Sequence, residues 1–233
     1  MAKIVILTGA GISAESGIRT FRASDGLWED HRIEDVATPE GFGADPELVH
    51  EFYNMRRATA AAARPNAAHV ALAQLERAPQ HQVLVVTQNV DDLHERAGSQ
   101  HVIHMHGTLF GHLCHSCDHR WPAPAISTAH DLCPACHQPA TRPDIVWFGE
   151  MPYRMDEIWT ALRGADLFVS IGTSGNVYPA AGFAQDAMRT GVATLELNLD
   201  RSSGSHIFDE SRQGLASVLV PQWVDQICTA KPN

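Results

Sequence analysis

Short runs of apolar and β-branched residues recur along the chain, and each run gives way at once to small or polar residues. We expect these runs to be buried strands, at Ile4–Leu7, Val83–Val86, Val102–Ile103, Leu167–Ile171 and Val192–Leu197. Helical spacing of apolar residues marks the segments between them, at Ala67–Glu76, Leu93–Ala97, Met155–Leu162 and Ala180–Arg189. This alternation predicts an α/β fold with a doubly wound parallel sheet, which binds ligands at the carboxyl ends of its strands.

Two stretches interrupt the alternation. From Asp30 to about Ala63 the pattern is helical and broken by prolines. From Leu109 to Trp147 the chain is rich in Cys, His and Pro with little periodicity, so we expect a metal-held insertion without a sheet. A strand at Asp144–Phe148 should follow. Near the C-terminus we expect a short strand at Ala216–Val220 and a closing helix at Pro221–Cys228.

Composition limits the possible partners. The 233 residues, of which 44% are hydrophobic, suffice for one large domain with a smaller lobe. The formal net charge of −10 opposes general nucleic-acid binding, which needs a basic face. The sequence shows neither a secretion signal nor an apolar run of membrane-spanning length. We therefore expect a soluble, cytoplasmic monomer with no nucleic-acid or membrane partner.

Polar or small residues follow the first two strands. The Thr8–Ala14 loop carries glycines where a helix begins, which lets a backbone approach a phosphate. Its Gly-x-Gly-x-x-Ala pattern resembles the dinucleotide-binding fingerprint. In that fingerprint a second strand ends in Asp or Glu about 20 residues later, and this chain has no such strand. The alternative is that the loop is a tight turn without a ligand. Three polar residues, Gln88, Asn89 and Asp91, lie just past the second strand, where a polar ligand would bind.

Two histidines follow the third strand. His104 and His106 alternate, so their side chains are expected on one face. A histidine near a strand end is more often structural than catalytic. However, Gly107 opens the backbone beside His106, and an imidazole that titrates near neutral pH suits a general base.

The five cysteines include two close pairs. Cys114 and Cys117 form the first Cys-x-x-Cys pair, and Cys133 and Cys136 form the second. Four thiolates at this spacing predict a tetrahedral zinc site, which is structural because no position is left for water. His115, His119 and His137 lie close enough to substitute as ligands, and Cys228 is expected to be a core thiol.

Taken together, these motifs resemble those of the sirtuins, most closely the bacterial CobB type. The resemblance spans nearly the whole chain and is carried, in order, by Gly9–Arg22, Thr87–Asp91, His104–Gly107, the two cysteine pairs, Val146–Glu150, Gly172–Ser174 and Asn198–Asp200. Sirtuins are NAD-dependent protein lysine deacylases. The resemblance implies NAD as co-substrate, one structural zinc ion, and proteins or peptides bearing acyl-lysine as partners.

The resemblance also implies the domain organisation. Residues 1–28, 66–108 and 150–233 would form a Rossmann-like NAD-binding domain. A helical module at 29–65 and a zinc-ribbon module at 109–149 would form the small domain. NAD and the peptide would enter the cleft between the two domains from opposite sides.

The implied chemistry is attack of the acyl oxygen on the nicotinamide ribose, which expels nicotinamide. His106 would be the general base on a ribose hydroxyl, and Asn89 and Asp91 would hold the nicotinamide end. The products would be free lysine, nicotinamide and 2′-O-acyl-ADP-ribose. The residues implied to bind NAD are Gly9, Ala10, Gly11, Ile12, Ser13, Thr20, Phe21, Arg22, Trp28, Gln88, Asn89, Val90, Asp91, Gly172, Thr173, Ser174, Asn198, Leu199, Asp200 and Ala216. A peptide would pair as an added strand with Val146, Trp147, Phe148, Gly149 and Glu150.

Tyr53 and Arg56 lie one helical turn apart, which is often an ordinary surface pair. Here they match the Tyr-x-x-Arg signature of sirtuins that remove succinyl and malonyl groups, because Arg and Tyr donate to a carboxylate. Ala37 matches a small residue that widens the acyl pocket in that class. Arg57 is expected to face solvent.

Two other functions remain open at this stage. Only Gly9 and Gly11 suggest a hydride-transferring NAD dehydrogenase. The absence of a following strand that ends in Asp or Glu argues against this function. A non-catalytic zinc-ribbon binding module is opposed by the intact set of Asn89, Asp91 and His106.

Overall fold

A six-stranded parallel sheet forms the body of the protein. The computed structural model describes residues 1–20, 27–28 and 31–229. The strand order is β11-β10-β9-β1-β4-β5. These strands span Ala2–Thr8 (β1), His81–Thr87 (β4), Val102–His104 (β5), Leu167–Ile171 (β9), Ala193–Asn198 (β10) and Glu210–Gln213 (β11). The predicted doubly wound sheet is confirmed, with all five predicted strands of the alternating pattern in it.

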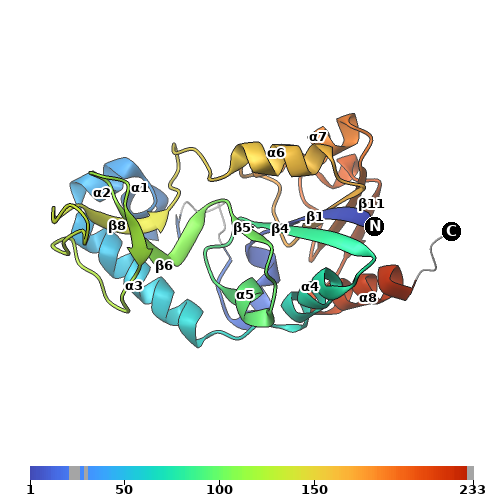
Figure 1. Ribbon diagram of the computed structural model, residues 1–233, viewed down its shortest axis with the longest axis horizontal. Helices are drawn as coiled ribbons and strands as arrows, with labels where there is room; N and C mark the ends of the chain where they lie inside the picture. Colours follow the sequence, from blue (N-terminus) through green and yellow to red (C-terminus); the bar gives the residue numbers. More distant parts are fainter. Residues whose placement is uncertain (21–26, 29–30, 230–233) are drawn as a thin grey trace.

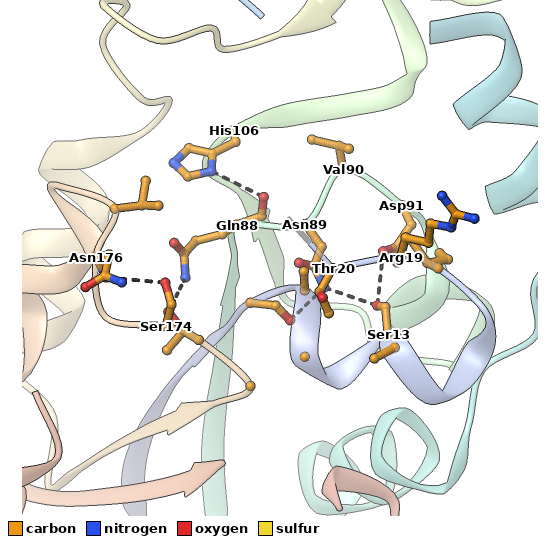
Figure 2. Close-up of a pocket in the computed structure, with 18 of the residues that line it drawn as sticks. Ser13, Arg19, Thr20, Gln88, Asn89, Val90, Asp91, His106, Ser174 and Asn176 are labelled. Carbon is orange, nitrogen blue, oxygen red and sulfur yellow. Dashed lines mark hydrogen bonds between the residues drawn. The ribbon is translucent and has the colours of Figure 1, made fainter. Parts of the chain in front are cut away.

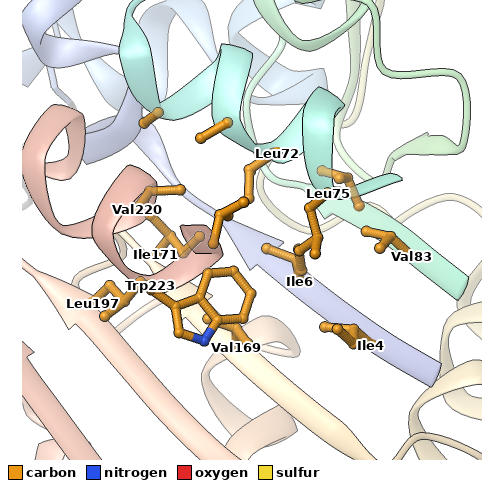
Figure 3. Close-up of a cluster of buried hydrophobic side chains, with 14 of the residues drawn as sticks. Ile4, Ile6, Leu72, Leu75, Val83, Val169, Ile171, Leu197, Val220 and Trp223 are labelled. Atoms are coloured by element: carbon orange, nitrogen blue, oxygen red, sulfur yellow. The ribbon is translucent and has the colours of Figure 1, made fainter. Parts of the chain in front are cut away.

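Helices cover both faces of this sheet. On one face lie α4 (Ala67–Arg77) and α8 (Ala216–Thr229), and on the other α6 (Met155–Arg163) and α7 (Phe183–Arg189) (Figure 1). Figure 3 shows the first of these interfaces, where Leu72 and Trp223 meet strand side chains such as Ile6. Because both faces are buried, the strands carry apolar residues throughout rather than alternating ones.

A second group of elements lies at the other end of the molecule (Figure 1). Its helices are α1 (Ile33–Val36), α2 (Pro39–Ala44) and α3 (Pro46–Ala62). Its strands are β6 (Gly107–Cys114), β7 (Arg120–Pro122) and β8 (Thr141–Ile145), which form an antiparallel sheet in the order β7-β6-β8. A separate buried cluster that includes Phe52 and Trp147 joins α3 to this sheet.

Several local predictions are wrong. The cysteine-rich insertion does contain a sheet, whose strands carry Gly, His, Arg and Pro residues that hide an apolar periodicity. The strand predicted at Asp144–Phe148 ends at Ile145, because Trp147 to Glu150 form a turn in which Glu150 N–H donates to Trp147 O at 3.0 Å. The loop after β1 forms two short 3-10 helices, Ala10–Ile12 (η1) and Ala14–Ser16 (η2), rather than one α-helix.

The strand predicted at Ala216–Val220 is instead the first part of helix α8. Glu15 accepts hydrogen bonds from the backbone and hydroxyl of Ser217, which satisfies donors at the helix N-terminus. Val220 and Trp223 then pack against α4 with helical spacing. This tertiary contact outweighs the strand preference of the β-branched residues.

The prediction that Arg57 faces solvent is also wrong, because the residue is only 3% exposed. Its guanidinium donates to Leu109 O at 2.7 Å, to Asn54 Oδ1 at 2.8 Å and to Ala125 O at 3.3 Å. The charged group therefore anchors α3 to backbone carbonyls of the cysteine-rich insertion.

The remaining elements are short. They are η3 (Ala180–Gly182), η4 (Ser205–Ile207), α5 (Leu93–Ala97) and the β2–β3 pair (Leu27–Trp28 and His31–Arg32). Helix α5 ends, as predicted, at Ala97, and Gly98 caps it with a φ of 104°. Among the helices of residues 1–20 and 31–229, none is long and apolar enough to cross a membrane.

The core beneath α4 allows a stability test. Leu72 is 0% exposed, whereas Val70 on the same helix is 42% exposed. We expect Leu72→Ala to lower the free energy of unfolding by about 2–5 kcal/mol, because it removes buried methyl groups and leaves a cavity. Denaturant unfolding followed by circular dichroism measures the change. Val70→Ala is the control and should shift it by less than about 0.5 kcal/mol. Equal shifts for the two variants would contradict the packing described here.

Candidate active site

A cavity of about 710 Å³ lies where the parallel strands end and the second group of elements begins. Almost every predicted NAD-binding residue whose side chain is described lines it. These are Gly9, Ala10, Gly11, Ser13, Thr20, Gln88, Asn89, Val90, Asp91, Gly172, Thr173, Ser174, Asn198, Leu199, Asp200 and Ala216. His106 lines the same cavity, as do the predicted peptide and acyl residues Ala37, Tyr53, Arg56, Val146, Trp147, Phe148, Gly149 and Glu150.

Backbone contact between two strand-end loops forms one side of the cavity. Gly11 N–H donates to Gly172 O at 2.8 Å. A Cβ on Gly11 would lie 2.7 Å from Gly172 Cα, and one on Gly9 would lie 2.8 Å from Gly172 O. Glycine is therefore required at these two positions of the β1 loop, because a side chain there would clash with the β9 loop. This close contact holds both loops beside the cavity.

A chain of buried polar side chains connects the β1 loop to the loop after β4 (Figure 2). Asn89 Nδ2 donates to Gly9 O and to Ser13 Oγ, each at 3.1 Å. Ser13 Oγ donates to Asp91 Oδ2 at 3.1 Å, and Leu93 N–H donates to Asp91 Oδ1 at 3.1 Å. Burial raises the pKa of Asp91, and the hydrogen bonds from Leu93 and Ser13 partly oppose that rise. Asn89 and Asp91 are thus held rigidly at the cavity wall.

His106 lies beside this group with a defined tautomer. Its Nδ1 lies 3.2 Å from Gln88 O, as Figure 2 shows. A carbonyl oxygen only accepts, so Nδ1 carries the proton and Nε2 keeps its lone pair. Burial lowers the pKa of His106, although the bond to Gln88 opposes this. The neutral imidazole therefore dominates at neutral pH, with Nε2 able to accept a proton.

His104 has a different environment. Its Nδ1 lies 3.1 Å from Asn89 O and its Nε2 lies 2.8 Å from Glu95 Oε1. Burial disfavours its charge, but the hydrogen bond and charge of Glu95 raise the pKa of His104 overall. Both ring nitrogens are thus used within the protein, and His104 supports Asn89 without lining the cavity.

Tyr53 and Arg56 lie side by side on α3, as predicted. The Arg56 guanidinium carbon lies 5.9 Å from the centroid of the Tyr53 ring and 5.6 Å from that of Phe52. Tyr53 is 0% exposed and accepts a hydrogen bond from Trp147 Nε1 at 3.0 Å. The Arg56 cation and the buried Tyr53 side chain therefore lie together at one part of the cavity wall.

The segment after β8 has few free donors for a peptide. Trp147 N–H donates to Glu150 Oε2 at 2.8 Å, Phe148 N–H to Ala37 O at 3.0 Å, and Val146 N–H to His106 O at 2.9 Å. Glu150 N–H is used within the turn described above. An added strand would therefore have to pair through the segment's carbonyl groups and Gly149 N–H.

Some predicted residues do not line the cavity. Ile12 is 0% exposed and belongs to the hydrophobic core under α4, because the 3-10 turn directs it inward. Phe21 and Arg22 lie outside the described residues, as does the side chain of Trp28.

The sequence analysis missed other lining residues. They are Glu15, Ile18, Arg19, Met55, Thr59, Ala60, Leu109, Ile145, Pro152, Asn176, Val177, Tyr178, Leu197, Arg201, Ser202, Ser203 and Leu215. Asn176 could have been found, because it directly follows the glycine-rich end of β9 (Figure 2). Thr59 and Ser203 carry no comparable local signal and reach the cavity only through tertiary packing.

The four paired cysteines converge, as predicted. Their Sγ atoms all lie within 4.8 Å of one another, with 3.6 Å between Cys114 and Cys136 and 3.7 Å between Cys117 and Cys133. Thiolates around a zinc ion at about 2.3 Å would lie roughly 3.8 Å apart. The cysteines therefore fit a structural zinc ion, which would hold β6 and β7 to the loop before β8.

The cavity combines a glycine loop, a buried amide and carboxylate, and a neutral imidazole at the ends of parallel strands. This is typical of an enzyme that binds a dinucleotide across the strand ends and a second substrate beside it. The Sir2 family model matches residues 9–179. This chain belongs to the Sir2 family, which confirms the resemblance to the sirtuins.

Individual relatives agree over nearly the whole chain. An NAD-dependent protein deacylase of Vibrio cholerae is 57% identical and covers 98% of this chain and 94% of its own length. The protein of that name from Escherichia coli is 55% identical over 97% of this chain and 82% of its own. A solved complex of a Sir2 homologue with NAD has a TM-score of 0.89 at 41% identity, covering 97% of this chain and 89% of the other. A Sir2 protein bound to an acetylated peptide has a TM-score of 0.84 at 30% identity, covering 98% and 94%.

The cysteine geometry yields a test of metal content. We expect the purified protein to hold about one zinc ion per chain, because four thiolates complete a tetrahedral site. Mass-spectrometric metal analysis measures it. The double variant Cys114→Ser, Cys117→Ser should lose the zinc and melt at lower temperature, whereas Cys228→Ser should retain it. Full zinc content in the double variant would contradict the assigned ligands.

Proposed function

We propose that this protein is an NAD-dependent protein lysine deacylase. The observation that carries the proposal is His106, whose Nδ1 is fixed by Gln88 O while its neutral Nε2 is left as a base beside Asn89 and Asp91. Membership of the Sir2 family and the names of the relatives above support the same activity.

In this proposal NAD lies along the strand ends. Asn89 and Asp91 hold the nicotinamide end, while Gln88 and His106 face its ribose. The β1 loop, which includes Gly9, Ala10, Gly11, Ser13 and Thr20, lies beside the phosphates. Gly172, Thr173 and Ser174 hold phosphate and the second ribose, and Asn198, Leu199, Asp200 and Ala216 surround the adenosine.

The protein residues have defined tasks in the reaction. The acyl oxygen attacks the nicotinamide ribose carbon, and nicotinamide leaves. A ribose hydroxyl then adds to the acyl carbon, and water replaces the lysine nitrogen there, which releases free lysine and gives 2′-O-acyl-ADP-ribose. His106 Nε2 accepts the proton of a ribose hydroxyl, and Gln88 O stabilises the imidazolium through Nδ1–H. Since Asn89 and Asp91 are held by Ser13 and Gly9, they need little reorganisation when NAD binds.

The peptide lies against the segment after β8. With most of the N–H groups of residues 146–150 used internally, the peptide donates its own N–H groups to the carbonyls of this segment and accepts from Gly149. Contacts of this kind involve backbone rather than side chains, so they favour a broad range of protein substrates.

The acyl group lies between Ala37, Tyr53 and Arg56. Ala37 leaves space, and the Arg56 guanidinium and Tyr53 hydroxyl offer charge-assisted hydrogen bonds to a carboxylate. One such bond is worth roughly 1.5–3 kcal/mol, which suffices for a preference of tenfold or more. We therefore propose removal of succinyl and malonyl as well as acetyl groups.

The proposed domain division follows the buried clusters: those on the two faces of the parallel sheet fall in one domain, and the cluster of Phe52 and Trp147 falls mostly in the other. Residues 1–28, 66–108 and 150–233 build the NAD-binding domain, and modules 29–65 and 109–149 build the small domain. The shared cluster of α3 with β6 and β8 supports the pairing of the two modules. We further propose that the protein acts as a monomer in the cytoplasm, where zinc-binding thiols stay reduced.

The deacylase proposal is tested with His106→Ala. We expect turnover to fall by at least about a hundredfold, because no base remains to take the ribose proton. Mass spectrometry of acetyl-, malonyl- and succinyl-lysine peptides, with and without NAD, measures the products. Thermal melting in the presence of NAD checks that the variant folds and binds.

The control is His101→Ala, which removes an exposed histidine outside the cavity. It should retain the wild-type rate. Wild-type rates in His106→Ala would remove His106 from the mechanism, and NADH formation without nicotinamide release would favour the dehydrogenase.

The acyl preference is tested with Arg56→Met. We expect desuccinylation to fall at least about tenfold more than deacetylation, because only the succinyl carboxylate needs the cation. The kcat/KM values for one peptide carrying each acyl group give the ratio. Arg64→Met, at an exposed arginine beyond the end of α3, should leave the ratio unchanged. An equal loss on both substrates would contradict the assignment of Tyr53 and Arg56.

A further inference from the structure

The hydroxyl of Tyr53 is already held by a hydrogen bond inside the protein. Trp147 donates its indole Nε1–H to Tyr53 Oη at 3.0 Å, and the two residues are 3% and 0% exposed. An indole N–H can only donate, whereas a phenol has one proton and also accepts. The Tyr53 oxygen is therefore the acceptor in this bond, and its single proton remains available for another group.

Arg142 and Glu150 fix the orientation of Trp147. The Arg142 guanidinium carbon lies 3.5 Å from the centroid of the Trp147 ring. Arg142 donates to both Glu150 carboxylate oxygens, at 2.7 Å and 2.9 Å, and to Ile145 O at 2.8 Å. Glu150 also accepts from Trp147 N–H at 2.8 Å. Because the ring face and the backbone of Trp147 are both held, the direction of its Nε1–H is set.

The Tyr53 proton is well placed for a ligand in the cavity. Tyr53, Ala37 and Arg56 all line it, and the Arg56 guanidinium carbon lies 5.9 Å from the Tyr53 ring centroid. Burial raises the pKa of Tyr53 to about 12, so the hydroxyl keeps its proton at neutral pH. Tyr53 and the Arg56 guanidinium therefore line the same part of the cavity.

We infer that Trp147 determines specificity for acidic acyl groups, because its indole N–H orients the Tyr53 hydroxyl as a donor to the acyl carboxylate. This inference rests on the acyl preference proposed above. A phenylalanine at this position would keep most of the packing but leave the Tyr53 hydroxyl free to rotate. For the acyl preference, Trp147 is thus a positioning residue that acts through Tyr53.

The test is a double-mutant cycle with wild type, Trp147→Phe, Tyr53→Phe and the double variant. The kcat and KM are measured for one peptide carrying acetyl- or succinyl-lysine. We expect Trp147→Phe to lower the succinyl-to-acetyl ratio of kcat/KM roughly three- to tenfold, chiefly through the KM for the succinyl peptide. In the Tyr53→Phe background the same substitution should leave this ratio unchanged, because no hydroxyl remains to orient.

The matched control is Trp159→Phe, since Trp159 lies on α6 against Phe183 and outside the cavity. It should not change the ratio in either background. Thermal melting first checks that each variant folds. Should Trp147→Phe fail to fold, Arg142→Lys takes its place in the cycle, because it removes the paired hydrogen bonds to Glu150 that hold the Arg142 guanidinium against the Trp147 ring.

The outcomes separate the inference from the proposed function. If Trp147→Phe lowers the ratio equally with and without the Tyr53 hydroxyl, or leaves it unchanged in both, the inference is overturned while desuccinylation stands. If the wild-type protein removes acetyl but no succinyl group, the acyl preference and the inference both fall. Deacetylation by the same protein would still support the deacylase activity.

Discussion

The backbone contact between the β1 and β9 loops is the constraint on which the site depends. Gly11 donates to Gly172 O, and a side chain at Gly9 or Gly11 would come within 2.8 Å of backbone atoms of the other loop. Asn89 adds the loop after β4 through its bond to Gly9 O. Three strand ends are thereby joined into one rigid wall, so the groups that would face NAD are positioned before it binds.

The polar groups on this wall are arranged so that most of their hydrogen bonds are internal. Ser13 connects Asn89 to Asp91 through hydrogen bonds. The environments of His104 and His106 differ, and so do the pKa values of the two side chains. Glu95 raises the pKa of His104, which supports Asn89, whereas burial lowers that of His106 and leaves it a neutral base. Opposite pKa shifts in neighbouring histidines thus distinguish the supporting His104 from His106, the proposed base.

The acyl side of the cavity depends on a different set of contacts, which no single element provides. Tyr53 comes from α3, Trp147 from the turn after β8, and Arg142 from β8 itself. The buried hydrogen bond between Trp147 and Tyr53 connects helix and turn, so the packing of these elements also sets the direction of the Tyr53 hydroxyl, which is the proposed donor to the acyl group. If the proposed acyl preference holds, stability and acyl specificity are coupled at this point.

The sequence by itself determined the parallel sheet, the zinc ligands and most of the cavity wall, because buried apolar runs, Cys-x-x-Cys spacing and strand-end residues are local signals. It misplaced Arg57 and the start of α8, whose positions depend on Leu109 O and Glu15, which are distant in sequence. It also missed the sheet of the cysteine-rich insertion. Only the tertiary structure decided these features, together with the tautomer of His106 and the partner of Tyr53, because each requires atoms that meet only after the chain has folded.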